Sequence, residues 1–278
     1  MPQLTSDEIS LTYEVRGPDS AHLPVVLIHG LLFSSRTMQG LSSALPDRRV
    51  FLLDLRGHGN SSAPREAEAY TRELLVSDVV ALLDHVGLDR VVLGGMSLGA
   101  AVTLEVARRH PDRLAAIILE MPVFSRSEAV GRPVFGALAR GLSMGAPALG
   151  LIRPITRRVP VPRRSHWLSW AKETVAGDHR AMAALLRGIL RERLDPASAE
   201  LLQDIRMPAL VVAHGVGMGR RVRDPIHVLD DSLDAAEHLP NSRLVRTYTF
   251  FDHRANPRNL AQHIRRFLAD VEQGRTIH

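Results

Sequence analysis

Short apolar segments alternate with helix-like segments along most of the chain, and this alternation limits the possible folds more than any other feature. Several of the apolar segments are rich in Val, Ile and Leu without intervening polar residues, which is typical of strands buried on both faces. The predicted strands are residues 9–15, 25–29, 50–54, 91–95, 114–120, 209–213 and 242–250, and the predicted helices are residues 72–86, 98–109, 229–238 and 259–271. We therefore expect an α/β fold, with a mostly parallel sheet covered by helices on both faces.

The alternation stops between residues 124 and 206, where no strand-like run occurs. Residues 124–200 hold 13 Arg and Lys against 6 Asp and Glu, so the net charge of +5 is concentrated in this stretch. We expect a core domain formed by residues 1–123 and 207–278, with residues 124–206 inserted as a helical cap.

Composition excludes several classes of protein. The 278 residues include no cysteine, which excludes disulfides, a thiol nucleophile and cysteine-ligated metals. No apolar run approaches the roughly 18 residues of a membrane span, and the N-terminus lacks the pattern of a secretion signal. The sequence therefore predicts a cytoplasmic protein without a membrane span.

The basic character of the chain has two interpretations. A pI near 10.5 would suit a nucleic-acid partner, but Lys172 is the only lysine among 35 basic residues. A bias toward arginine codons explains that imbalance without any ligand, and the arginine-rich stretch lacks interleaved aromatic residues. We expect no nucleic-acid partner.

The strongest local signal is Gly95-Met-Ser97-Leu-Gly99, which lies between a predicted strand and a predicted helix. In a G-x-S-x-G turn the serine occupies a strained position, and larger residues two positions away would clash. The helix N-terminus favours negative charge that develops beside the hydroxyl. The pattern predicts a nucleophilic Ser97.

A second glycine turn follows the predicted strand at residues 25–29, in the order His29-Gly30-Leu31. Backbone N–H groups in such a turn can point into the space above the sheet. The amides of Leu31 and Leu98 are therefore predicted to form an oxyanion hole. We expect His29 itself to brace the loop.

Three motifs occur in one order: His29-Gly30, the segment Asp-Leu-Arg-Gly-His-Gly-Asn-Ser at residues 54–61, and the turn around Ser97. In this order they resemble the N-terminal signatures of the α/β-hydrolase superfamily. The resemblance covers residues 9–122 and resumes over residues 207–268, with the variable cap of the family between them. It implies an α/β-hydrolase fold, the chain order Ser, Asp or Glu, then His, and structural roles for Asp54 and His58.

The acid and the base are expected in the C-terminal third. Asp224 is the first carboxylate after the strand predicted at residues 209–213, and its surroundings are similar to the D-x-I turn of the family. Glu120 is the alternative acid. His253 stands where the histidine of the family is expected, although Asp252 replaces the usual glycine before it. His227 is the alternative base, or a loop histidine that caps the following helix.

These residues predict a serine hydrolase that needs no cofactor and no metal. Ser97 would attack a small to medium hydrophobic ester, lactone or thioester, with His253 as base and Asp224 as its partner. The alternative is a catalytically silent, ligand-binding member of the same fold, which the unusual Asp252 favours.

The substrate is expected to be a small molecule, and only the cap carries information about it. The arginines of the cap would attract an anionic or carrier-linked substrate, or form a solvated surface. Four aromatic residues are candidate pocket walls, namely Phe124, Phe135, Trp167 and Trp170. No sequence feature determines the oligomeric state.

Overall fold

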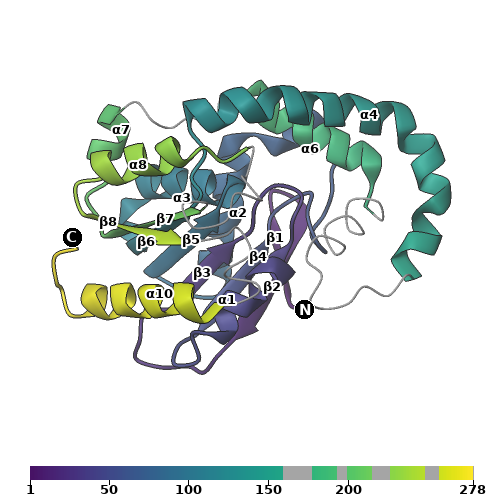
Figure 1. Cartoon of the computed structure of the whole chain (residues 1–278). Helices are drawn as coiled ribbons and strands as arrows, with labels where there is room; N and C mark the ends of the chain where they lie inside the picture. The colour runs from purple at the N-terminus through teal and green to yellow at the C-terminus, as the bar shows by residue number, and fades with distance from the viewer. Residues whose placement is uncertain (159–176, 193–198, 215–225, 248–256, 278) are drawn as a thin grey trace.

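A computed structural model describes residues 1–158, 177–192, 199–214, 226–247 and 257–277. Within these ranges, eight strands form one sheet in the order β1-β2-β4-β3-β5-β6-β7-β8 (Figure 1). The strands are β1 (Gln3–Ser6), β2 (Ile9–Arg16), β3 (Val25–Ile28), β4 (Val50–Asp54), β5 (Val91–Met96), β6 (Leu114–Glu120), β7 (Ala209–His214) and β8 (Ser242–Thr247). The predicted α/β fold is confirmed.

The helices connect and cover the strands. The α-helices are α1 (Gln39–Ser43), α2 (Arg72–His85), α3 (Leu98–Arg109), α4 (Ser125–Arg158), α6 (His179–Arg191), α7 (Ala199–Gln203), α8 (Leu229–His238) and α10 (Pro257–Glu272). Three short 3₁₀ helices are η1 (Ser35–Met38), η2 (Ala67–Tyr70) and η3 (Pro111–Arg113). No helix in the described ranges is both long and apolar enough to cross a bilayer.

Strand β1 was not predicted from the sequence. It pairs antiparallel with β2, which in turn pairs antiparallel with β4, whereas all pairs from β4 to β8 are parallel. The loop between β1 and β2 consists of Asp7 and Glu8, with φ angles of 44° and 66°. Asn-Gly or Asp-Gly usually occupies such a turn, so this hairpin carries no ordinary turn signal.

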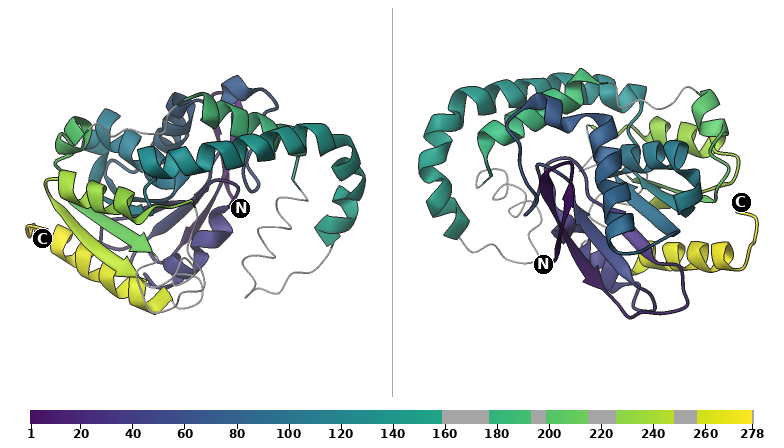
Figure 2. Two further views of the ribbon diagram at one scale, coloured as in Figure 1. Left: turned by 45° about the horizontal axis from the view of Figure 1, so that its top comes forward. Right: turned by 180° about the vertical axis from the view of Figure 1, so that it is seen from behind.

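Each face of the sheet contacts a separate hydrophobic cluster. In β3, Val26 and Ile28 contribute to the cluster beneath α2, α3 and α8, while Val25 and Leu27 contribute to the cluster beneath α1 and α10. Figure 2 shows these helices on opposite faces of the sheet. Because successive side chains of a strand point to opposite faces, a strand buried on both faces is apolar at every position. This explains the continuous apolar runs in the sequence.

Helices α4 and α6 pack side by side above the carboxyl ends of the strands (Figures 1 and 2). The N-cap of helix α6 is Asp178, whose carboxylate accepts the N–H groups of Arg180 and Ala181. In the described part of residues 124–206, every regular element is helical. The boundaries of the cap remain a prediction.

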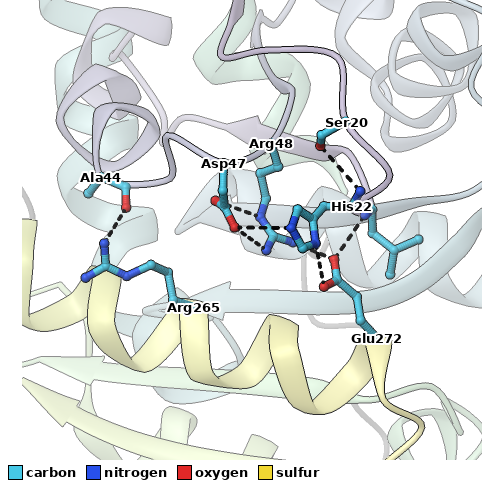
Figure 3. Close-up of polar contacts among 8 residues, drawn as sticks. Ser20, His22, Ala44, Asp47, Arg48, Arg265 and Glu272 are labelled. Carbon is cyan, nitrogen blue, oxygen red and sulfur yellow. Dashed lines mark hydrogen bonds and ion pairs between the residues drawn. The ribbon is translucent and has the colours of Figure 1, made fainter.

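A polar cluster joins α10 to the loops that precede β3 and β4 (Figure 3). The buried guanidinium of Arg48 donates to Glu272 at 2.8 Å and to Asp47 at 2.9 Å. His22 Nδ1 lies 2.9 Å from the Glu272 carboxylate, and Arg265 donates to the carbonyl of Ala44. The cluster therefore lies at the amino ends of the parallel strands.

Candidate active site

Ser97 connects β5 to α3 with φ 53° and ψ −111°, a region that side-chain-bearing residues rarely occupy. A Cβ on Gly95 would lie 2.0 Å from the carbonyl oxygen of Gly99, and a Cβ on Gly99 would lie 2.5 Å from that of Ile28. Both collisions involve backbone atoms, which cannot move aside easily. The steric reason for the G-x-S-x-G spacing is therefore present in the fold.

Two hydrogen bonds link Ser97 to other parts of the chain. Its backbone N–H donates to the carbonyl of Glu120 at the end of β6, at 2.9 Å. Its Oγ lies 2.8 Å from Nε2 of His227, which precedes α8. Because imidazole accepts a proton near neutral pH, this arrangement can activate the hydroxyl.

The segment around His227 is attached to the start of α4. The N–H of Val228 donates to Ser127 Oγ at 2.9 Å. The buried carboxylate of Asp231 accepts the N–H groups of Phe124 and Ser127, at 2.9 and 2.8 Å. These contacts hold His227 against Ser97. The interpretation of His227 as a capping residue is wrong, because the N-cap of α8 is Val228 and has no side-chain capping bond.

The acid and base expected from the sequence, Asp224 and His253, lie outside the described residues, as does Asp252. Their roles remain predictions. The alternative acid, Glu120, is described: its carboxylate lies 2.8 Å from Nε2 of His214 at the end of β7.

His214 was not singled out by the sequence analysis. Its Nδ1 contacts the hydroxyl of Thr247 at the end of β8, and Glu120, His214 and Thr247 are all buried. Only the position of His214 at the end of a predicted strand could have drawn attention to it. The sheet thus aligns three polar side chains on neighbouring strand ends beside the nucleophile turn.

Ser97 lies at the floor of a largely apolar pocket of about 590 Å³, including the space at its open mouth. Leu31, Leu98 and Ile226 line the part near the serine, and α4 and α6 supply the remaining walls. Phe135 is one of these wall residues, as the sequence suggested. Phe124 is instead buried in the core, and Trp167 and Trp170 lie outside the described residues.

Two buried histidines brace the turn that contains Leu31, and their rings lie 4.8 Å apart. His29 Nε2 accepts the N–H of Leu55, and His58 Nε2 accepts the N–H of Leu32. Each Nδ1 faces a backbone carbonyl, at 2.8 and 2.9 Å respectively. Since Nε2 must accept a hydrogen bond, both rings are neutral and protonated at Nδ1.

Burial lowers the pKa of His29 to about 4, and burial together with the neighbouring His29 lowers the pKa of His58 to about 3. Charging either ring would desolvate a cation and break its bond to a backbone N–H. Both histidines are therefore structural, and the expected bracing role of His29 is confirmed.

Asp54 also has the structural role expected of it. Its carboxylate accepts the N–H groups of Ser35 and Asn60, at 2.7 and 3.0 Å. Gly59 has φ 54°, and a Cβ there would lie 2.2 Å from that carboxylate. The loop at residues 54–61 is thus a fixed support for the turn that contains Leu31.

Comparison with known proteins agrees with this geometry. Residues 24–141 match the model of the alpha/beta hydrolase fold. Epoxide hydrolase A of Mycobacterium tuberculosis is 37% identical over 107 residues, covering 37% of this chain and 33% of that protein. The chain spans less than half the length of the curated relatives it matches.

Solved structures match almost the whole chain. The enol-lactonase from Burkholderia xenovorans LB400 has a TM-score of 0.75 and 21% identity, over 96% of this chain and all of that one. A thermophilic esterase from Thermogutta terrifontis has a TM-score of 0.74 and 26% identity, over 97% and 98% of the two chains. With its sheet order and its strand–Ser97–helix turn, the chain has the α/β-hydrolase fold.

Proposed function

We propose that the chain is a serine hydrolase that cleaves a small to medium hydrophobic ester, lactone or thioester. The observation that carries this proposal is the 2.8 Å contact between Ser97 Oγ and His227 Nε2 at the floor of an apolar pocket. A nucleophile within hydrogen-bond reach of a base is the arrangement that acyl transfer requires. Two solved structures of similar fold are an enol-lactonase and an esterase, and both names describe hydrolysis of a carboxylic ester bond.

In the proposed reaction, Ser97 Oγ bonds to the carbonyl carbon while its proton passes to a histidine. The amides of Leu31 and Leu98 stabilise the resulting oxyanion, a contribution worth about 10²- to 10³-fold in kcat per donor. The oxyanion collapses and the bond to the leaving oxygen or sulfur breaks, with the proton of the histidine going to that atom. An ester releases an alcohol and a thioester a thiol, whereas the hydroxyl of an opened lactone stays on the acyl group; in each case an acyl-enzyme remains. Water then repeats the sequence and releases the acid, which restores the Ser97 hydroxyl.

The nucleophile favours an acyl substrate over an epoxide, although several relatives are named epoxide hydrolases. Attack of Ser97 on a carbonyl gives an ester, which water can cleave through the same oxyanion hole. Attack on an epoxide carbon would give an ether, which has no carbonyl to accept water and would leave the enzyme alkylated. We therefore expect turnover of esters and no turnover of epoxides.

Two histidines compete for the role of base. His227 has the contact with Ser97 in its favour, and His253 has its place in the motif order of the family. Asp224 lies three residues before His227 and 29 before His253 in the chain, so it remains the proposed acid for either.

Fluorophosphonate labelling, read by intact mass, together with turnover of p-nitrophenyl acetate, tests this function. We expect stoichiometric labelling of the wild type and none of Ser97→Ala. The histidine whose change to Ala strongly slows both labelling and turnover is the base, and the other variant serves as its control. Absence of labelling in a folded wild-type protein would contradict the proposal and favour the silent, ligand-binding alternative.

A further inference from the structure

The pocket wall formed by α4 contains a glycine at the point where the helix passes over the core. Gly131 lies within this helix and lines the pocket together with Phe135 and Ile226. Glycine in a helix interior is unfavourable by about 1 kcal/mol relative to alanine. Its presence on the wall therefore leaves space in the pocket at a cost to the helix.

The space beside Gly131 faces the pocket. A Cβ built on Gly131 would lie 3.4 Å from the ring of Phe135 and 3.7 Å from Cγ2 of Ile226, both of which are ordinary contacts. Alanine therefore fits, while each further carbon of a longer side chain would extend among the residues that line the pocket. A larger side chain at this position would therefore reduce the volume open to a ligand.

The charged residues of the same wall compensate one another. Arg132 donates to the Glu128 carboxylate and to the carbonyl of Leu190 on α6, each at 2.6 Å. The Glu128 side chain is only 12% exposed. The remaining charged lining residue, Glu192, is 38% exposed; it accepts the backbone N–H of Arg72 at 2.9 Å and lies 4.0 Å from the Arg72 guanidinium.

This charge pattern disfavours an anionic ligand within the described pocket. Two carboxylates and one guanidinium line it, and that guanidinium is already bonded to one of the carboxylates. A free carboxylate at the end of a substrate chain would lose its hydration and face Glu128 and Glu192. An uncharged chain contacts the apolar walls without losing the hydration of a charge.

We propose that the substrate places an uncharged apolar chain in this pocket and that Gly131 sets the length of chain that fits. This inference rests on the proposed serine hydrolase function and names the substrate class of the same site. Because the anionic or carrier-linked substrates expected from the sequence depend on arginines beyond the described side chains, they are not proposed for this pocket.

The test compares kcat/KM for p-nitrophenyl acetate, butyrate, hexanoate and octanoate, and for hexyl acetate against ethyl acetate, in Gly131→Leu and Gly141→Leu. Gly141 lies on the same helix, is exposed, and would have no atom within 4 Å of its Cβ. In Gly131→Leu we expect the preference for the long over the short chain to fall about tenfold or more in one of the two series. Gly141→Leu should retain the wild-type preference.

Gly131→Ala gives a second measurement if the leucine variant does not fold, and it should shift the preference in the same direction by a smaller factor. Equal chain-length preferences in wild type, Gly131→Ala and Gly131→Leu would overturn the inference. If fluorophosphonate does not label the folded wild type, the proposed function would instead be overturned.

If the wild type is not labelled, ligand binding alone tests whether Gly131 sets the length of chain that fits the pocket. Hexanamide, which needs no chemistry, should raise the Tm of the wild type and of Gly141→Leu but not that of Gly131→Leu. Equal shifts in all three proteins would overturn the inference.

The charge pattern has its own test, in which p-nitrophenyl hexanoate is compared with the p-nitrophenyl monoester of adipic acid. We expect the wild type to prefer the uncharged ester by about tenfold or more, and Glu128→Gln to reduce this preference because Arg132 is then released. A wild type that cleaves the carboxylate ester equally well would show that the pocket does not select an uncharged chain.

Discussion

The two ends of the parallel strands differ in how they hold polar side chains. At the amino ends, Arg48 and Glu272 are charged partners in a cluster that attaches α10 to the loops (Figure 3). At the carboxyl ends, His29 and His58 are buried and neutral, and they accept the backbone N–H groups of Leu55 and Leu32. Both arrangements satisfy polar groups, but only the second positions atoms beside Ser97. Changes at the amino ends should therefore lower stability alone, whereas changes at the carboxyl ends should also disturb the site.

The largest effect is expected for Gly95→Ala at the carboxyl end. Its Cβ would lie 2.0 Å from the carbonyl oxygen of Gly99, so the turn must open, and we expect a loss of about 3 kcal/mol or more in the free energy of unfolding. Urea denaturation measures this loss. The control is Gly94→Ala, whose Cβ would instead meet the movable end of Leu27 at 2.8 Å. Equal losses in both variants would contradict the steric account of the turn.

A second large effect is expected on acidification. Because the pKa values of His29 and His58 in the folded protein, about 4 and about 3, lie below the ordinary 6.5, the unfolded chain binds protons first as the pH falls. The two neutral histidines therefore contribute fully to the free energy of unfolding above pH 6.5. This contribution is lost toward pH 4 and below, by on the order of 3 kcal/mol per histidine.

Urea midpoints between about pH 7 and pH 4 test this prediction. His58→Gln keeps a neutral acceptor for the N–H of Leu32 but cannot titrate, so its stability should depend less steeply on pH. An unchanged pH dependence in this variant would mean that His58 is not the titrating group.

A smaller effect is expected at the amino end. Arg48→Met retains the buried stem but leaves Glu272 without its 2.8 Å guanidinium partner, and we expect a loss of about 2 kcal/mol in unfolding free energy. The kcat/KM for an ester should stay within about twofold, because α10 does not line the pocket in the described part of the chain.

Arg49→Ala provides the comparison for Arg48→Met. Arg49 pairs with Asp19, and their side chains are 43% and 79% exposed, so its removal should change stability by less than about 0.5 kcal/mol. A large loss of activity in Arg48→Met at full folding would show that the two ends are coupled.

The smallest effect is expected in the pocket wall. Gly131→Ala should raise unfolding free energy by up to about 1 kcal/mol and Tm by about 2–4 °C, because alanine favours the helix and its Cβ fits. Gly141→Ala, in open surroundings on the same helix, should give a similar gain. Destabilisation by the first change alone would mean that Phe135 and Ile226 cannot accommodate a methyl group.

The sequence predicted the core strands because their signal is local. In β3 and β4 every residue is buried, so a nearly unbroken apolar run indicates the strand. Strand β1 has only four residues and a hairpin turn of two acidic residues, and neither feature indicates a strand. Edge strands are shaped by pairing with a neighbour, which a short run of residues does not reveal.

The candidate site was predicted in part for the same reason. The glycines that make room for the turn at Ser97 lie within five residues of sequence. The loop that holds His29 and His58 neutral also contains a motif that is visible in the sequence. The contact between His227 and Ser97 joins residues 130 positions apart, and the sequence indicated His227 only as the alternative to His253 as base. Residues so far apart in the chain meet only because the start of α4 packs against the segment before α8.

The sequence alone determined the alternating strands and helices and the glycines around Ser97, because steric collisions and side-chain periodicity act over a few residues. Only the tertiary structure decided that Glu120 meets His214, that His227 reaches the nucleophile, and that Gly131 opens the pocket wall. These pairings depend on where separate elements come to lie after their apolar faces are buried, and that position is a property of the whole core rather than of any one segment.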